Sequence, residues 1–410
     1  MMIDARESRL KVLVCGGGCA GPAVALWLAR AGHQITVVER FSALRATGAQ
    51  VDLRGQGVEA VRRMGLLEAV RGKLVDEPGV SFVDARGRAK ATIMVNTSGA
   101  GAQSLTSEYE IMRGDLVRIL YDATRANVRY VFGKSVERVD QSDDLVTAHF
   151  SDGSRDTYDL VVGADGQGSR IRGAVLPPNL AEPYLRMGIH MAYWFIPRAA
   201  TDSNIRETYN APGGRMIMRR SHNPLETQVY FVLRETSEEA SAIHRDSIER
   251  QKQFWTKRFK DAGWQTERFL EGMATTSSFY SQEVVQVRAS TWSKGRIVLA
   301  GDAAHCASPF SGMGISGALV GAYVLAGEIN RRPDDLPQAL AHYDRVLRPF
   351  VAEIQDLKPF LLRLGMPMTR WGINALHTAT ALACFLKIPS LATKFSMQDR
   401  DGGWRLPDYG

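Results

Sequence analysis

The sequence predicts an α/β fold, in which a helix-covered parallel sheet is joined to a second, antiparallel sheet and to C-terminal helices. Two glycine-rich loops predict the parallel sheet, because each follows a short apolar run and precedes a helical one. Alternating residues between positions 187 and 234 predict the antiparallel sheet. Since 410 residues exceed the length at which one hydrophobic core keeps growing, we expect two or three domains.

The composition is that of a globular protein with excess positive charge. The formal net charge is +7 and the basic residues are scattered, which favours anionic small molecules, an anionic cofactor among them, over nucleic acid. The four cysteines lack metal-ligand spacing, and Cys15 and Cys384 lie in apolar runs, so we expect no metal site and a reducing compartment. Residues 1–10 do not resemble a signal peptide, and Ile373–Ile388 is too short to cross a bilayer. We therefore expect a cytoplasmic protein without a membrane span.

The first glycine-rich loop has the pattern G-x-G-x-x-G and follows the apolar run Leu10–Cys15. Gly16 allows a tight turn, Gly18 lets the backbone approach a pyrophosphate, and Gly21 lets helix and strand pack closely. This placement between a strand and a helix predicts dinucleotide binding.

The elements after this loop support the same interpretation. The helix expected at 20–31 has Pro22 in its first turn, and the strand expected at 34–39 ends in Glu39, 18 residues beyond Gly21. Glu39 is placed to accept hydrogen bonds from an adenosine ribose. This unit alone does not separate FAD from NAD.

The segment 40–57 is irregular, and its portion Gly48–Asp52 has little side-chain bulk, so it could run past a planar ring. An ordinary loop followed by an edge strand is the alternative. The polar tract Asn96–Ser107 predicts a mobile loop. The other elements expected before residue 150 are helices at 57–70 and from 111 onward, and strands at 80–84, 91–95, 129–132, 136–139 and 146–150.

Two later strands end in an aspartate. One apolar run ends at Asp165, and the run 296–300 ends just before Asp302. In open α/β sheets, ligands bind beyond the carboxyl ends of the strands, so both aspartates are placed to contact a ligand. A loop with a proline and several glycines then leads into the apolar helix Ile315–Ile329, whose first N–H groups can hold an anion or a polyol.

Three motifs thus stand in order along the chain: Gly16-x-Gly18-x-x-Gly21 with Glu39, then Asp165-Gly166-x-x-Ser169-x-x-Arg172, then Gly301-Asp302-Ala-Ala-His305 with Pro309, Gly312 and Gly314. Together they resemble the signatures of the class A FAD-dependent aromatic hydroxylases, of which para-hydroxybenzoate hydroxylase is the type. The resemblance covers about residues 10–350. Within that family, the sequence is most similar to the tetracycline-inactivating flavin monooxygenases.

The resemblance implies a Rossmann-like FAD-binding domain with a three-layer ββα order, formed by residues 1–74, 106–182 and 285–348. A substrate-binding antiparallel β-sheet domain would comprise residues 75–105 and 183–284, with a helix at 251–262. Residues 349–410 would form a helical segment that bridges the domains, with helices at 351–364 and 371–385. A membrane-surface helix at 369–385 is the alternative.

By the same resemblance, FAD binds noncovalently, and NADPH or NADH is a transient reductant, since no second G-x-G-x-x-G occurs. Arg113 would reach toward the ribityl chain and pyrophosphate, and Asp302 would bind the ribityl hydroxyls. Arg45 is also a candidate contact for the reduced nucleotide. Ser316 and Gly321 depart from the family, in which many members have an asparagine and an acid. The expected FAD-binding residues are Gly16, Gly18, Ala20, Gly21, Pro22, Glu39, Arg40, Arg45, Asp52, Arg113, Val136, Asp165, Gly301, Asp302, Pro309, Gly312, Met313, Gly314 and Ile315.

The second sheet and the glycine loop are expected to present the substrate contacts. A short match around Arg215 resembles a stretch with a substrate-binding arginine in the tetracycline-inactivating enzymes. Strand alternation would turn about half of the candidates toward a pocket, and the rest would pack in the core. The expected substrate contacts are Tyr193, Phe195, Arg215, Met216, Tyr230, Pro309 and Phe310.

The implied reaction is hydroxylation of a planar phenolic or polycyclic (tetracycline- or polyketide-like) substrate through a C4a-hydroperoxyflavin, acting as a monomer. The flavin carries the oxygen chemistry, so no side chain is named as the catalyst. His305 is expected to be structural, and His190 is a weaker candidate base. The alternative is an FAD-dependent reductase or dehydrogenase that inserts no oxygen. A non-catalytic FAD-binding protein is a third possibility, and a halogenase is disfavoured because paired tryptophans are lacking.

Overall fold

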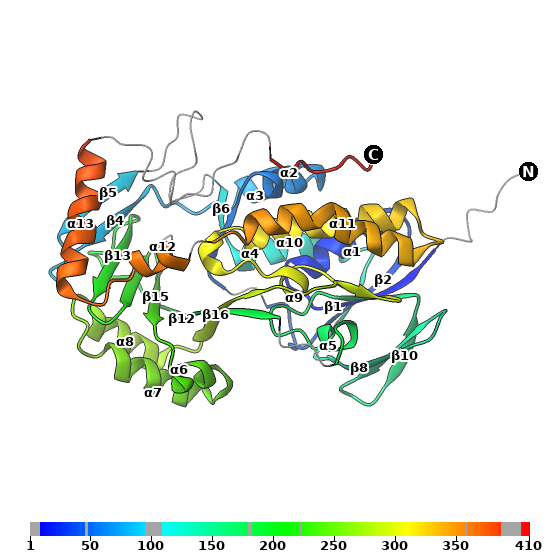
Figure 1. The fold of residues 1–410 in the computed structure, drawn as a ribbon, viewed down its shortest axis with the longest axis horizontal. Coiled ribbons are helices and arrows are strands. Elements are labelled where there is room, and N and C mark those ends of the chain that lie inside the picture. Colours follow the sequence, from blue (N-terminus) through cyan, green and yellow to red (C-terminus); the bar gives the residue numbers. More distant parts are fainter. Residues whose placement is uncertain are drawn as a thin grey trace, which may run out of the picture.

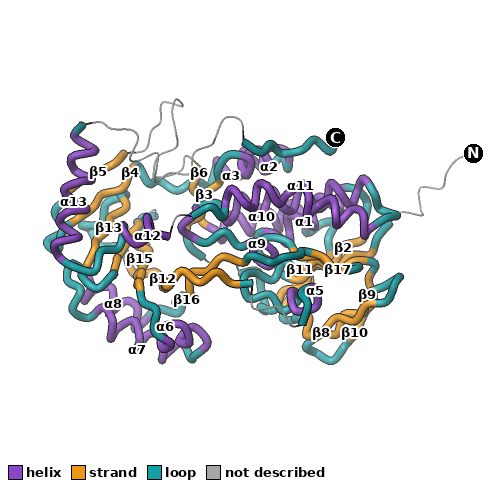
Figure 2. The backbone as a smooth tube through the Cα atoms, viewed as in Figure 1, coloured by secondary structure: helices purple, strands orange, loops and turns teal. Residues whose placement is uncertain are grey.

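The computed structural model describes residues 9–45, 48–94, 109–178, 183–221, 223–357, 359–386 and 403–410. Two main sheets lie side by side, each with helices of its own (Figure 1). Helices gather above the first sheet and on the outer sides of the second (Figure 2). The mobile loop predicted at Asn96–Ser107 lies outside the described residues, as do residues 1–8.

The first sheet has six strands, and five of them are parallel to one another. Val12, Leu13 and Val14 of its central strand have no exposed surface, because the sheet is covered on both faces. In spatial order its strands are β17 (Ser293–Lys294), β18 (Ile297–Leu299), β11 (Leu160–Gly163), β1 (Lys11–Cys15), β2 (Gln34–Glu39) and β7 (Arg129–Phe132).

Helices cover one face of this sheet, and a small antiparallel sheet lies over the other (Figure 1). The helical layer contains α1 (Ala20–Arg30), α4 (Arg113–Thr124) and α10 (Gly314–Arg331), and α11 (Leu336–Ile354) packs on α10. The small sheet consists of β8 (Val136–Gln141), β9 (Val146–Phe150) and β10 (Arg155–Tyr158). The predicted Rossmann-like ββα order is confirmed.

Two local predictions in this region are wrong. The single helix expected at 57–70 is split into α2 (Gln56–Arg63) and α3 (Leu67–Arg71), because Gly65 between them has a φ of 72°. Residues 111 and 112 belong to β6 (Tyr109–Met112), which pairs with β3 (Gln50–Leu53), so the next helix begins only at Arg113. Short helices α5 (Arg172–Val175) and α9 (Asp302–His305) and a 3-10 turn at Pro309–Ser311 complete the loops.

The second sheet has seven strands, which are antiparallel except where β4 and β13 run parallel. Four of its strands, β12 to β15, come from the region expected to be antiparallel. In spatial order they are β16 (Tyr280–Val287), β12 (Tyr184–Pro197), β15 (Glu226–Arg234), β14 (Arg215–Arg220), β13 (Arg206–Ala211), β4 (Gly79–Val83) and β5 (Ala89–Met94).

One face of the second sheet packs on an aromatic core. Trp194 and Phe231 meet edge to face with ring centroids 4.8 Å apart, and Phe231 stacks on Phe259 at 4.2 Å. The helices on this face are α6 (Glu238–Ala242), α7 (Ile248–Phe259) and α8 (Thr266–Thr275), with a 3-10 turn at Ile243–Arg245. Because strand side chains alternate, burial of this face leaves the other face free for a site.

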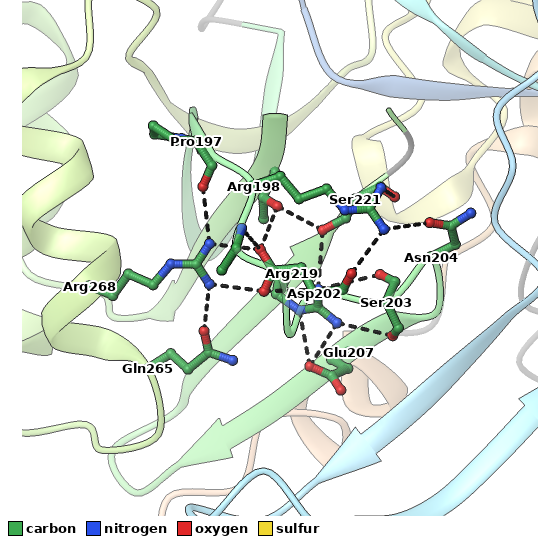
Figure 3. Close-up of polar contacts among 12 residues, drawn as sticks. Pro197, Arg198, Asp202, Ser203, Asn204, Glu207, Arg219, Ser221, Gln265 and Arg268 are labelled. Atoms are coloured by element: carbon green, nitrogen blue, oxygen red, sulfur yellow. Dashed lines mark hydrogen bonds and ion pairs between the residues drawn. The ribbon is translucent and has the colours of Figure 1, made fainter. Parts of the chain in front are cut away.

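A buried ion network anchors the loop between β12 and β13 to this back face (Figure 3). The Asp202 carboxylate has no exposed surface, and it lies 2.7 Å from Arg268 Nη2 and 3.2 Å from Arg219 Nη1. Although burial opposes ionisation, hydrogen bonds from Arg268 and neighbouring groups lower the pKa of Asp202 to about 2. Arg219 also pairs with Glu207, 2.9 Å away, so both side chains point to the back of the sheet.

Helix α11 runs through Pro349 to Ile354, so the predicted start of a new helix after Pro349 is wrong. Proline removes one helical hydrogen bond, but the buried side chains of Leu347, Phe350 and Val351 hold this helix against the core.

The C-terminal region contacts both sheets. After α12 (Pro359–Leu364), α13 (Arg370–Phe385) packs on β5 of the second sheet. Trp404 then donates a hydrogen bond from Nε1 to the carbonyl of Val346, 2.9 Å away, on the side of the first sheet. Within the described ranges, no helix is both long and apolar enough to cross a membrane.

Candidate functional site

A cavity of about 2100 Å³ is lined by residues of both main sheets. Pockets for one small ligand usually measure about 300–1,000 Å³, so this cavity can hold two molecules. On the first sheet its wall is formed by the loops that follow β1, β2, β11 and β18. This is the carboxyl edge of a parallel sheet, where open α/β folds bind their ligands.

The G-x-G-x-x-G loop is shaped by close backbone contacts. Gly16 has a φ of 117°, and a Cβ there would lie 2.4 Å from the carbonyl oxygen of Ala164. A Cβ at Gly21 would lie 1.9 Å from the carbonyl oxygen of Gly16, so Gly21 serves the packing of helix on strand. The N–H of Gly17 donates to Glu39 Oε2 at 2.8 Å, which places this carboxylate at the end of β2 beside the loop.

Arg113 lies over two of the glycines. A Cβ at Gly48 would lie 3.1 Å from its Cδ, and a Cβ at Gly18 would lie 3.3 Å from its Nη2. The missing side chains therefore make room for the arginine stem and bring its guanidinium to the loop. Both the arginine and Gly18 line the cavity, so a cation stands where the pyrophosphate is expected.

Asp302 follows β18 and lines the same cavity. Although the residue is exposed to the open cavity, the protein that surrounds the cavity desolvates this carboxyl and raises its pKa, while Cys306 and Arg113 act in the opposite direction. Gly301 takes a φ of 59°, and a Cβ there would lie 2.7 Å from the Cβ of Ala20. This turn aims Asp302 into the cavity and leaves Gly301 behind the wall.

The loop before α10 opens the N-terminus of that helix to the cavity. A Cβ at Gly314 would meet nothing within 4 Å, and Gly312 to Ile315 all line the cavity. Gly312 turns left-handed against Asp52 and Arg54, which form a 2.9 Å ion pair. The exposed helix N-terminus favours negative charge, as the pyrimidine edge of a reduced flavin would provide.

The two departures from the family both have structural roles. Ser316 Oγ, fully buried, accepts a hydrogen bond from the N–H of Arg54 at 2.9 Å and ties α10 to the segment after β3. A Cβ at Gly321 would lie 3.1 Å from Nε2 of His305, so the glycine leaves room for that ring. An acidic side chain at 321 would need the space that His305 fills.

Neither candidate histidine lines the cavity. His305 is 3% exposed, and burial lowers its pKa to about 4. His190 is fully buried, stacks on His244 at 5.1 Å and shares a 2.9 Å contact with it between ring nitrogens. Both histidines therefore belong to the packing around the site.

The second sheet contributes one row of side chains that crosses six strands. Neighbours in this row are direct pairing partners, and together they span about 24 Å at the usual strand spacing. All of them line the cavity. In order the row is Tyr280, Tyr193, Tyr230, Met218, Thr208 and Phe82.

The structure does not bring two of the expected substrate residues to the cavity. Arg215 and Met216 are adjacent on β14, so they face opposite sides, and Met216 lines the cavity. Arg215 instead pairs with Asp261, with Nη1 and Oδ1 2.7 Å apart. Phe195 shares a face with Tyr193 but lies one step farther along β12 and is absent from the cavity wall. The remaining expected substrate contacts, Tyr193, Met216, Tyr230, Pro309 and Phe310, line the cavity.

Most of the expected FAD-binding residues line the cavity, and three of them do not. Gly21, Pro22 and Gly301 lie behind the wall, where they support the loops. The others line the cavity: Gly16, Gly18, Ala20, Glu39, Arg40, Arg45, Asp52, Arg113, Val136, Asp165, Asp302, Pro309, Gly312, Met313, Gly314 and Ile315.

Sequence reasoning missed a charged part of the wall next to Asp52. Arg220 donates two hydrogen bonds to Glu77, at 2.8 and 2.7 Å, and also bonds to Glu110. Burial raises the pKa of Glu110 to about 7, although Arg220 opposes the shift. Arg206 lines the cavity beside this group. No sequence signal joins these residues, because they come from separate strands and loops.

Comparison with known proteins places the chain among flavoproteins. Residues 9–354 match the family described as FAD binding domain. The FAD-dependent monooxygenase asL4 of Sarocladium schorii is 36% identical over 423 residues, which cover 98% of each protein. A flavin-dependent monooxygenase of Legionella longbeachae is 35% identical over 84% of this chain and 87% of its own. The crystal structure of tetracycline destructase Tet(51) is similar with a TM-score of 0.79 and 31% identity, over 98% of this chain and 99% of that one.

Proposed function

The chain belongs to the flavin-dependent monooxygenases that share this FAD-binding domain, and on that premise we propose that it hydroxylates a planar phenolic or polycyclic substrate. Its cofactor is FAD. We propose NADPH or NADH as the reductant and dioxygen as the source of the inserted oxygen. Because Tet(51) is a tetracycline destructase, tetracycline-like and polyketide rings are the first substrates to test.

The row from Tyr280 to Phe82 is the observation that supports this proposal most directly. Tyr193 lies between Tyr230 and Tyr280, with ring centroids 5.7 and 5.2 Å away. Such a broad aromatic surface suits a planar ring system. The row and the open N-terminus of α10 line one cavity, so a flat substrate held on the row would face the flavin site.

The residues of the first sheet suit FAD. Gly16 and Gly18 allow the backbone to approach a pyrophosphate, and Arg113 supplies a cation beside them. Bound FAD supplies the redox and oxygen chemistry. The N–H groups at Gly314 and Ile315 would stabilise negative charge at the ring, and the tyrosines of the row would exclude water from it.

Three finer points belong to the same proposal. We assign the FAD-binding unit to residues 1–74, 106–182 and 285–348, the substrate-binding unit to 75–105 and 183–284, and the bridging segment to 349–410. Arg45 lines the cavity with its guanidinium 5.5 Å from the Tyr280 ring, and it is the proposed contact for the transient nicotinamide nucleotide. We also propose a monomer as the active unit.

The test separates hydroxylation from oxygen-free flavin chemistry. The purified protein is reduced anaerobically with NADPH or NADH in the presence of phenolic and tetracycline-like substrates, and ¹⁸O₂ is then admitted. We expect a flavin spectrum, substrate-stimulated nucleotide oxidation and a product that carries one ¹⁸O atom. A product formed without dioxygen would favour the reductase alternative. A colourless protein that does not bind added FAD would contradict both the hydroxylase and the reductase.

A further inference from the structure

Three side chains of the cavity wall have buried polar atoms without a hydrogen-bond partner in the described part of the chain. Thr208 Oγ1, Arg206 Nε and both polar atoms of the Gln50 amide have none among the residues that the structure describes. Thr208 is 3% exposed and Gln50 is 7% exposed. Buried polar groups are nearly always paired, and leaving one unpaired costs about 1–3 kcal/mol. All three residues line the cavity, so a bound ligand can supply the missing partners.

The back of the sheet fixes the orientation of Arg206 and Thr208. Between them in β13, Glu207 accepts a 3.0 Å hydrogen bond from Arg219 Nε on the back face (Figure 3). Tyr209 points the same way and donates from its hydroxyl to the carbonyl of Ala262 at 2.6 Å. Strand alternation then holds Arg206 and Thr208 toward the cavity.

Arg206 also lacks a salt bridge of its own. Across the described ranges, no carboxylate lies within 4 Å of its guanidinium; Glu77 and Glu110 pair with Arg220, and Asp52 pairs with Arg54. Desolvation and the nearby Arg220 lower the pKa of Arg206, while the three acids act in the opposite direction. A desolvated cation without a paired counter-charge is costly, and an anion in the cavity would relieve that cost.

Resting on the proposed hydroxylase function, we infer that Arg206 and Thr208, which share the cavity side of β13, form a subsite for an ionised oxygen of the ring substrate. The guanidinium presents paired N–H donors, and the hydroxyl of Thr208 adds a third donor. Met216 and Met218 on the adjacent strand contact the apolar body of the ring. The substrate class is therefore a planar ring that carries a phenolate, an enolate or a carboxylate.

The absence of a protein partner for Thr208 makes a sharp test. Thr208→Val keeps the shape of the side chain and breaks no hydrogen bond of the protein, so the fold should be as stable as in the wild type or more so. If the hydroxyl binds the substrate anion, the same change weakens binding about fivefold. Arg206→Gln should weaken binding tenfold or more, and Arg206→Lys, which keeps the charge, should weaken it less.

The measurement uses FAD-loaded protein titrated with four probes while the flavin absorbance is followed. Benzoate represents the carboxylate, 4-nitrophenolate the phenolate and the anion of cyclohexane-1,3-dione the enolate. Benzamide is the neutral match to benzoate. Arg138→Gln is the control for net charge. It also removes one positive charge, but the Arg138 side chain is exposed and does not line the cavity. The anion with the lowest dissociation constant indicates whether the subsite binds a carboxylate, a phenolate or an enolate oxygen.

We expect at least one anion to bind tighter than benzamide, and this preference to disappear in Arg206→Gln but not in Arg138→Gln. The inference is overturned if no anion binds tighter than benzamide, if Thr208→Val and Arg206→Gln bind anions like the wild type, or if Arg206→Gln loses its FAD. Hydroxylation that persists with wild-type affinity in these variants would reject the subsite alone. Anion binding through Arg206 without any hydroxylation would reject the proposed function alone.

Discussion

Gly314→Ala should weaken FAD binding without weakening the fold. In the structure, a Cβ at Gly314 would meet no atom within 4 Å, so the added methyl group has space in the protein itself. The residue begins α10, where alanine reduces the freedom of the unfolded chain by about 0.4–1 kcal/mol relative to glycine. The apoprotein is therefore expected to be as stable as the wild type, or slightly more stable.

The same methyl group would stand in the cavity where the flavin ring meets the helix N-terminus. Filling a closely packed contact with an extra methyl group costs about 1–3 kcal/mol. At 1.4 kcal/mol per factor of ten, FAD affinity should fall by about 5- to 150-fold. The added methyl group is therefore expected to lower the affinity for FAD while it leaves the stability of the apoprotein unchanged or slightly higher.

The assay compares the dissociation constant for FAD, from quenching of flavin fluorescence, with urea unfolding of the apoprotein. Gly173→Ala is the matched control, because its Cβ also meets nothing within 4 Å but the residue does not line the cavity. If Gly314→Ala binds FAD within twofold of the wild type, the flavin does not approach α10 and the placement is refuted. A loss of FAD in both variants would show that the effect is not local.

Three further outcomes are expected. Asp302→Ala should lower FAD affinity by about 5- to 150-fold, because each hydrogen bond lost by the ribityl chain costs about 1–3 kcal/mol; unchanged FAD content after gel filtration would contradict this. Arg215→Gln should leave the substrate KM within twofold of the wild type, since its guanidinium pairs with Asp261 away from the cavity; a tenfold rise in KM would return Arg215 to the substrate site. Asp202→Asn should destabilise the fold by about 1–3 kcal/mol, because Arg268 loses its paired carboxylate, whereas Arg219 keeps its ion pair with Glu207. Because the folded pKa of Asp202 is about 2 against an ordinary value of 3.8, its contribution is present above about pH 4 and lost as pH falls toward 2, so acid-unfolding curves of this variant should be flatter in that range.

The loops of the flavin site could be read from the sequence because their chemistry is local. A tight turn at Gly16 and an aspartate at the end of a strand depend on residues within a few positions of each other. The helix break at Gly65 was equally local, but a periodic apolar pattern on both sides concealed it. In the sequence Ser316 is only a departure from the family, and its contact with the N–H of Arg54 in the structure shows that it ties α10 to the segment after β3.

The substrate side depends on which strands pair and in which register. Alternation in β14 shows that Arg215 and Met216 face opposite ways, but it does not say which of them faces the cavity. The ion network around Asp202 and the aromatic core decide this, because they bury one face of the sheet and leave the other to the site. Pairing over long sequence distances then places Thr208 between Met218 and Phe82. The sequence by itself therefore determined a flavin-binding α/β chain with its glycine loops. Only the tertiary structure decided the aromatic row and the place of Arg206 beside it on β13, because strand pairing depends on contacts between distant segments.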